Sequence, residues 1–221
     1  MKKIFTAILG ALGVTSAHVE AEPPKVESVP AESIQFSMPT VAMDSIKFDM
    51  PTENLFNGAP QFHEDDWAQL EFFPSTRLSE VQKILKELKS FEANNRTQYG
   101  WKQIYRREIS RTSIGLSSAD LGHELNAKIR PAPILTTSSR TLGQVQHGYS
   151  LELGKNAYLY GLQGNGKITV LGVSLQGADD MLLSNAFLKL NQRYGLILVD
   201  WRQQFVLTSV SGTGQFELWR P

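Results

Sequence analysis

The spacing of apolar residues predicts an amphipathic helix over residues 78–91. Apolar side chains recur there every three or four positions, which places them on one face of a helix. Ser79 and Gln82 have the form of a capping box at its start. The residues of the apolar face are Leu78, Val81, Ile84, Leu85, Leu88 and Phe91.

Two further helices are expected from the same kind of spacing. The shorter one has Leu121, Leu125 and Ile129 at four-residue spacing. It begins at Ser118 or Asp120 and is ended by Pro131, because proline cannot continue a helix. The longer one spans residues 179–193, with Gly195 as its C-terminal stop.

Short runs of β-branched and aromatic residues predict strands, and glycine- and asparagine-containing turns that join several of them favour antiparallel hairpins. The polar stretch 136–148 is expected to be a loop. Together these patterns predict an α+β fold with a largely antiparallel sheet and helices packed on one of its faces. The expected strands are residues 67–73, 101–109, 149–153, 157–162, 167–175, 196–199, 205–210 and 215–219.

An internal similarity raises the hypothesis of two related β-α-β units. Residues 67–109 and 167–210 both run strand, helix, Tyr-Gly, strand. A duplicated unit built around one sheet would explain the pattern.

The N-terminus has the features of a bacterial export signal, predicted to be residues 1–21. Lys2 and Lys3 precede an apolar run over residues 4–14, and Ala21 ends a small-residue cleavage site. The run is well short of the roughly 20 residues that cross a bilayer, so we expect cleavage and no membrane insertion afterwards. The mature chain would then be periplasmic or secreted.

Residues 22–60 are rich in Pro, Ser, Glu and Ala and are expected to form a flexible linker ahead of a globular domain over residues 61–221. The linker holds a repeat of twelve residues, in which residues 33–40 recur as residues 45–52. As extended strands, the two copies present Phe36 and Met38, then Phe48 and Met50, on one face. Such a strand can pair with another protein's sheet or dock on its own domain, and we favour docking on its own domain.

Composition excludes several classes of function. Lys plus Arg and Asp plus Glu number 22 each, so no net charge draws the chain to nucleic acid. The absence of cysteine excludes thiol catalysis, disulfides and zinc-thiolate sites, and no cofactor is expected. Residues 161–167 have P-loop spacing, but they precede a predicted strand instead of a helix, and residues 172–177 are one residue too long for a hydrolase nucleophile elbow.

Two groups of residues could carry chemistry or binding. The run His63-Glu64-Asp65-Asp66 precedes a predicted strand, and His63, Asp65 and His123 are the first candidates if a metal is bound; we favour a solvated acidic start to the strand with surface histidines. Basic and aromatic residues cluster in and after the predicted strand 101–109. The cluster could bind an acidic partner, a polysaccharide or nucleic acid, but we favour a partly exposed strand paired with acidic neighbours; its residues are Trp101, Lys102, Tyr105, Arg106, Arg107 and Arg111.

The sequence therefore predicts an exported, non-catalytic domain that binds another envelope or secreted protein, as an inhibitor, an immunity-type partner or an accessory subunit. Phe36, Met38, Phe48 and Met50 of the repeat are its candidate recognition residues. A metal-dependent or acid-base hydrolase of the cell envelope and a carbohydrate-binding module are the alternatives.

Overall fold

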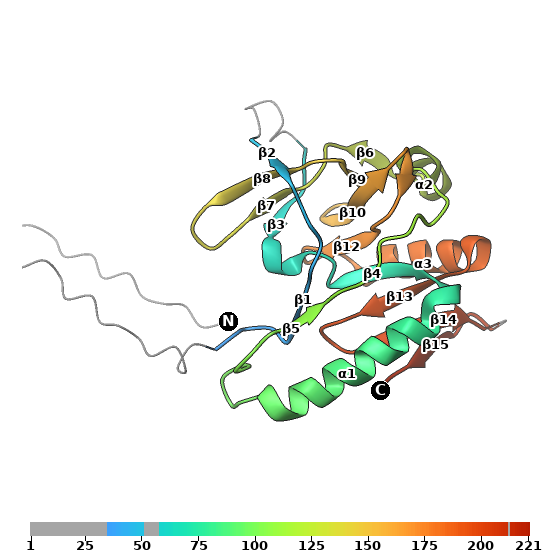
Figure 1. The fold of residues 1–221 in the computed structure, drawn as a ribbon. Helices are drawn as coiled ribbons and strands as arrows, with labels where there is room; N and C mark the ends of the chain where they lie inside the picture. The colour runs from blue at the N-terminus through green and yellow to red at the C-terminus, as the bar shows by residue number, and fades with distance from the viewer. Residues whose placement is uncertain (1–34, 51–57, 212) are drawn as a thin grey trace, which may run out of the picture.

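The computed structural model describes residues 35–50, 58–211 and 213–221, and it confirms an α+β fold (Figure 1). The predicted export signal therefore lies outside the described residues. No helix of the described part of the chain is both long enough and apolar enough to cross a membrane. The helices are α1 (Leu78–Asn95), α2 (Ser118–Leu125) and α3 (Asp180–Tyr194), with short 3-10 turns η3 (Glu64–Asp66) and η4 (Ser75–Arg77).

The largest sheet is antiparallel and has the strand order β15-β14-β13-β4-β12-β10-β9-β6, with β11 attached to β10. Its strands are β4 (Leu70–Pro74), β6 (Lys128–Arg130), β9 (Gly148–Gly154), β10 (Ala157–Gly164), β11 (Lys167–Ile168), β12 (Gly172–Leu175), β13 (Leu196–Asp200), β14 (Phe205–Val210) and β15 (Phe216–Trp219).

Two smaller sheets lie beside it. One has the order β2-β8-β7-β3, and the other pairs β1 with β5 in parallel. Residues 35–50 of the predicted linker contribute β1 and β2, so this part of the chain is paired with the domain. The strands are β1 (Thr40–Ala42), β2 (Phe48–Asp49), β3 (Gln61–His63), β5 (Tyr105–Arg107), β7 (Ile134–Thr136) and β8 (Thr141–Val145).

Helices cover both faces of the large sheet, so the expectation that all pack on one face is wrong. Consecutive side chains of a strand point to opposite faces, and on β4 both Phe72 and Phe73 are buried. Phe72 packs in a cluster with Phe187 of α3, which we call the α3 cluster, while Phe73 packs in a cluster with Leu85 of α1, the α1 cluster. Central strands that are apolar on both sides require a cover on each.

A third cluster covers the rest of the face on which α1 lies. It is centred on Tyr160 of β10, whose ring contacts Phe62 and Trp67 with centroids 4.6 and 5.1 Å away. Gly172 leaves room for this ring, since an added Cβ there would come within 2.7 Å of it. The Tyr160 cluster consists of Phe62, Trp67, Ala68, Leu135, Val145, Tyr160 and Val170.

Several helix and loop boundaries differ from those predicted. α1 is capped by Arg77 with no side-chain hydrogen bond, so the predicted capping box does not form; η4 leads directly into the helix. α2 ends at Asn126 in a left-handed conformation, five residues before Pro131, and the intervening chain forms β6. Residues 136–148 contain the strand β8, which pairs with β7, so the predicted loop is wrong. A bulge interrupts this pairing.

The third helix agrees with its prediction. Asp179 caps its start by accepting a hydrogen bond from the Met181 backbone N–H, and Gly195 ends it with φ of 62°. A glycine adopts this left-handed conformation without strain.

The two predicted β-α-β stretches are not equivalent in space. β12 and β13, which flank α3, both border β4 in the large sheet, whereas β4 and β5, which flank α1, lie in different sheets. Gly195 directly caps α3, but Gly100 lies five residues beyond the end of α1. The structure gives no support to the duplication hypothesis.

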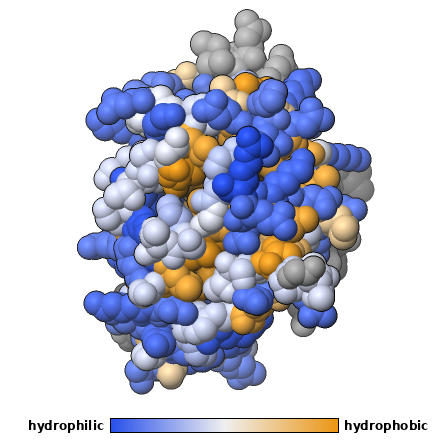
Figure 2. Space-filling model, turned by 90° about the vertical axis from the view of Figure 1, so that its right-hand side faces the viewer, coloured by the Kyte–Doolittle hydropathy of each residue, from blue (hydrophilic) through white to orange (hydrophobic). Residues whose placement is uncertain are grey.

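The side of the molecule that carries α2 and α3 mixes hydrophilic and hydrophobic residues (Figure 1 and Figure 2). Figure 2, which views the right-hand side of Figure 1, shows hydrophobic residues in several separate patches instead of one continuous area. The large apolar side chains exposed on the described part of the chain are likewise spread over many elements. Scattered apolar residues of this kind are normal for a protein surface.

We predict that Phe187→Ala lowers the free energy of unfolding by about 3–5 kcal/mol, because it leaves a cavity where Phe187 contacts Phe72 and Phe216. Met181→Ala on the same helix, at a residue that is 60% exposed, should change it by less than about 1 kcal/mol. Urea unfolding followed by circular dichroism measures both. Equal losses would show that α3 does not pack as described.

Candidate functional site

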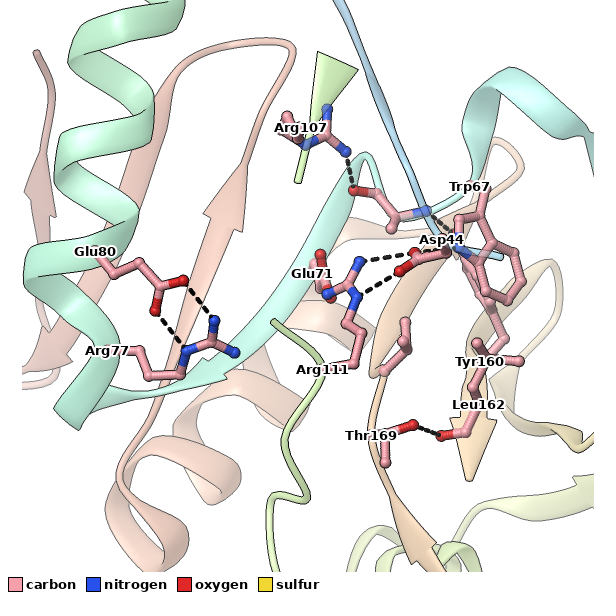
Figure 3. A network of polar contacts seen from close by, with 12 residues as sticks. Asp44, Trp67, Glu71, Arg77, Glu80, Arg107, Arg111, Tyr160, Leu162 and Thr169 are labelled. Atoms are coloured by element: carbon pink, nitrogen blue, oxygen red, sulfur yellow. Dashed lines mark hydrogen bonds and ion pairs between the residues drawn. The ribbon is translucent and has the colours of Figure 1, made fainter. Parts of the chain in front are cut away.

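A buried polar network lies where the α1 cluster meets the Tyr160 cluster (Figure 3). Arg111 is at its centre and donates to both oxygens of Asp44, at 2.5 Å from Nε and 2.7 Å from Nη2. Its third nitrogen donates to Glu71 of β4. Glu71 is fully buried and the Asp44 side chain is only 6% exposed, so this is an ion-pair network away from water. A loop, a central strand and the predicted linker are thereby joined.

Arg107 of β5 is the second buried cation of the network. Its guanidinium lies over the ring of Trp201, 4.8 Å from the centroid, and donates to the Thr40 hydroxyl and to the Ala68 carbonyl. The Thr40 hydroxyl donates in turn to the Tyr105 carbonyl at 2.8 Å. Arg107 therefore ties β1 and β5 to the chain just ahead of β4.

Burial shifts the pKa of these groups. Desolvation raises the pKa of Glu71 to about 7, because its effect exceeds the opposing attraction of Arg111. Desolvation also lowers the pKa of Arg107 to about 10, so this residue remains a cation at neutral pH. The second carboxylate oxygen of Glu71 has no hydrogen-bond partner among the described residues, which agrees with a carboxyl group that holds its proton readily.

The network holds Ala68 in a left-handed backbone conformation with φ of 51°. The Ala68 N–H donates to the Tyr160 hydroxyl at 2.8 Å, and its carbonyl accepts from Arg107 at 2.8 Å. A residue with a side chain pays about 1–2 kcal/mol for this conformation. Strain of this kind persists only where the surroundings fix it, and it is common at functional sites.

The turn at Ala68 separates two strands of the large sheet. β12 pairs with β10 along its whole length, but it pairs with β4 only through Gly172 and Glu71. β4 cannot continue beside β12 because the chain before Leu70 turns away. Among the described residues, the edge of β12 beyond Gly172 therefore has no partner strand on this side.

A groove of about 490 Å³ occupies the gap between the separated strands. Its walls come from β12, from β3 and from the turn between β13 and β14. The lining combines an apolar floor with amide and charged groups, and its residues are Gln61, Phe62, Asp66, Gln69, Leu70, Val173, Ser174, Leu175, Gln176, Asp200, Arg202 and Gln203.

Polar contacts fix several groove residues in place. Gln176 donates to the Gln61 carbonyl at 2.7 Å across the groove, and Arg202 pairs with Asp66 at 2.6 Å. Burial raises the pKa of Asp200, which accepts from the Gln203 backbone N–H. An acid with a raised pKa that lines a groove is a frequent mark of a functional site.

Gln69 connects the groove to the predicted linker. It lines the groove, and its amide nitrogen donates to the carbonyls of Thr40 and Asp65, both at 2.9 Å. Thr40 belongs to β1, so pairing of the linker with the domain positions a wall of the groove.

The structure brings together two groups of predicted binding residues, and they contact each other. Phe36 and Trp101 exchange backbone hydrogen bonds of 2.9 and 3.0 Å, and β1 pairs with the strand that holds Tyr105 and Arg107. The side chain of Arg107 is buried, as described above. The first repeat copy thus covers the basic-aromatic strand on its own chain.

The other candidate residues of the repeat differ in burial. Met38 is 8% exposed and Phe48 packs at the edge of the Tyr160 cluster, whereas Phe36 is 39% and Met50 80% exposed. The described parts of both copies lie on the chain's own domain.

The candidate metal residues do not form a site in the described part of the chain. His63 and Asp65 are 3.3 Å apart at the start of η3, where the His63 ring caps the turn, but His123 lies on α2. The described residues contain no group of three or more His, Cys, Asp or Glu that could hold a metal ion.

Sequence reasoning missed the groove. Its residues come from four separate stretches of the chain, and none of them forms a local motif. Asp200, an acid at the end of an apolar strand, was the one local signal. No protein-family model matches the chain, and no curated protein or solved structure is significantly similar to it.

We predict that Glu71→Gln makes stability less dependent on pH. Glu71 titrates near its ordinary 4.5 when unfolded and at about 7 when folded, so the unfolded chain releases this proton first as the pH rises. Relative to higher pH, protonated Glu71 adds roughly 3 kcal/mol to the free energy of unfolding below pH 4.5. This added stability declines as the pH rises and is lost by about pH 7.

Urea unfolding at several pH values between 4 and 8 measures this slope, with the exposed Glu64→Gln as the matched control. Between pH 4.5 and 7, the wild type and the control should lose stability relative to Glu71→Gln. Parallel curves for all three proteins would contradict the raised pKa.

Proposed function

We propose that this chain is an exported domain that acts by binding another protein, and that the groove receives an extended segment of its partner. The export signal predicted over residues 1–21 supports the location, in the periplasm or outside the cell. The observation that carries the binding proposal is the edge of β12 beside the groove, which has no partner strand there among the described residues.

An open strand edge favours a peptide that binds as an added strand. Backbone N–H and C=O groups of such an edge bind any extended chain, while neighbouring pockets select its side chains. The Gln176 backbone N–H donates to the Asn156 backbone carbonyl and therefore points toward β10. Because consecutive amides of a strand point to opposite sides, the Leu175 N–H points toward the groove.

The composition and size of the groove fit the same ligand. Phe62, Leu70, Val173 and Leu175 provide apolar contacts, and glutamine amides at the rim can donate to and accept from a peptide backbone. A volume of about 490 Å³ lies within the usual range for ligand sites, about 300–1,000 Å³.

This proposal moves the recognition site away from the repeat in residues 33–52. The described parts of both copies already pair with β5 and β8 of the same chain. The first copy instead supports the groove, since Thr40 holds Gln69.

We predict that Leu175→Pro weakens peptide binding roughly tenfold more than Leu175→Ala. Both substitutions remove the leucine side chain, but only proline removes the N–H that faces the groove, which leaves a peptide carbonyl unpaired. The probes are peptides selected against the purified protein from a random dodecapeptide phage library. Isothermal titration calorimetry of the synthetic peptides measures their dissociation constants.

Thermal unfolding of both variants shows whether each is folded. A library that yields no peptide, or peptides that bind Leu175→Pro and Leu175→Ala equally, would overturn strand addition to β12. Selected peptides that lose affinity when methylated on alternate backbone nitrogens would support it independently of any variant.

A further inference from the structure

A second, smaller pocket lies on the other side of the turn between β13 and β14. Its volume is about 230 Å³, and Arg202 and Gln203 line both this pocket and the groove. The two hollows therefore share one wall. The lining is mainly basic and amide, and its residues are Lys89, Glu92, Arg96, Arg202, Gln203, Gln204, Arg220 and Pro221.

The single acidic side chain of this basic pocket is already engaged. Glu92 accepts from the Trp101 ring N–H at 3.1 Å and from the Gln204 amide, and it lies 3.8 Å from Arg96. Among the described residues, no carboxylate forms an ion pair with Lys89 or Arg220. Arg202 is paired with Asp66, so Lys89 and Arg220 are the two cations of the pocket that have no ion-pair partner among the described residues.

Two of the basic side chains, Arg220 and Arg96, are held in position by contacts within the domain. Arg220 lies over the Phe205 ring, 5.2 Å from its centroid, and donates to the Gln203 carbonyl at 3.1 Å. Arg96 lies at the C-terminal end of α1 over the Trp101 ring, at 5.8 Å. Cations fixed in this way lose little conformational freedom on binding an anion.

We infer that the basic pocket binds a carboxylate of the partner segment whose backbone lies in the groove. This inference rests on the proposed function, because the shared wall of Arg202 and Gln203 lets one extended chain reach both hollows. A carboxylate is planar, and arginine binds it through paired hydrogen bonds. The partner segment would therefore be acidic at the end that passes the β13–β14 turn.

The first test uses glutarate, a small dicarboxylate, and does not depend on the groove. Nuclear magnetic resonance should show saturable shifts of the arginine side-chain Nε–H signals of Arg96 and Arg220 and of the Gln203 amide. The double variant Lys89→Gln with Arg220→Gln should weaken glutarate binding at least tenfold. The exposed Lys83→Gln on the same helix is the matched control and should bind as the wild type does.

The second test repeats the phage selection with the wild type and the double variant. We expect acidic residues at one end of the peptides that the wild type selects, and loss of that preference in the variant. Synthetic peptides with Glu→Gln changes or an amidated C-terminus show whether the carboxylate is a side chain or the chain end.

The outcomes separate this inference from the proposed function. Peptides that need the Leu175 N–H but show no acidic preference would overturn the inference and leave the proposed function intact. If glutarate binds but no peptide is selected, the basic pocket is an anion site and the groove has no peptide ligand. That result overturns both the proposed function and the inference. Absence of saturable glutarate binding would overturn the carboxylate pocket itself.

Discussion

The groove depends on the backbone of one buried residue, Ala68, which is held in a left-handed conformation. Tyr160 accepts from its N–H and Arg107 donates to its carbonyl, so two side chains from different sheets fix the turn. If Ala68 were extended, β4 could continue beside β12 and close the sheet. The turn instead ends that pairing at Gly172 and leaves the edge of β12 open.

Other parts of the chain stabilise the buried cation of Arg107 and accept hydrogen bonds from its two terminal nitrogens, while its Nε has no partner among the described residues. Trp201 offers its ring and Thr40 its hydroxyl, while Arg111 joins Glu71 to Asp44 nearby. Removing one partner of a buried ion pair typically costs 3–5 kcal/mol, whereas the intact pair contributes little net stability. We therefore expect the network to contribute more to fixing one arrangement of these segments than to net stability. It requires residues 40–44 to be seated on the domain, and Thr40 then supports the groove through Gln69.

Local patterns predicted the elements, and long-range contacts determined the site. The periodic spacing of α1 and the caps of α3 are properties of neighbouring residues, so these helices could be recognised in the sequence. The positive φ of Ala68 has no local signal, because alanine gives no indication of a left-handed turn. Its stabilising partners lie 39 and 92 residues away. The groove was missed for the same reason, since its residues come from separate stretches of the chain. Arg107 was predicted as a binding residue on a partly exposed strand, but its side chain lies in the interior.

The most direct test of this account is residue-specific hydrogen exchange of backbone amides in β12, measured with and without a selected peptide. In the free protein, the Leu175 amide should exchange quickly and the Gln176 amide slowly, because the Gln176 N–H donates to the Asn156 backbone carbonyl whereas the Leu175 N–H faces the groove. Bound peptide should slow Leu175 and leave Gln176 unchanged. Slow exchange of Leu175 in the free protein, or no protection by the peptide, would contradict an open strand edge that binds a partner.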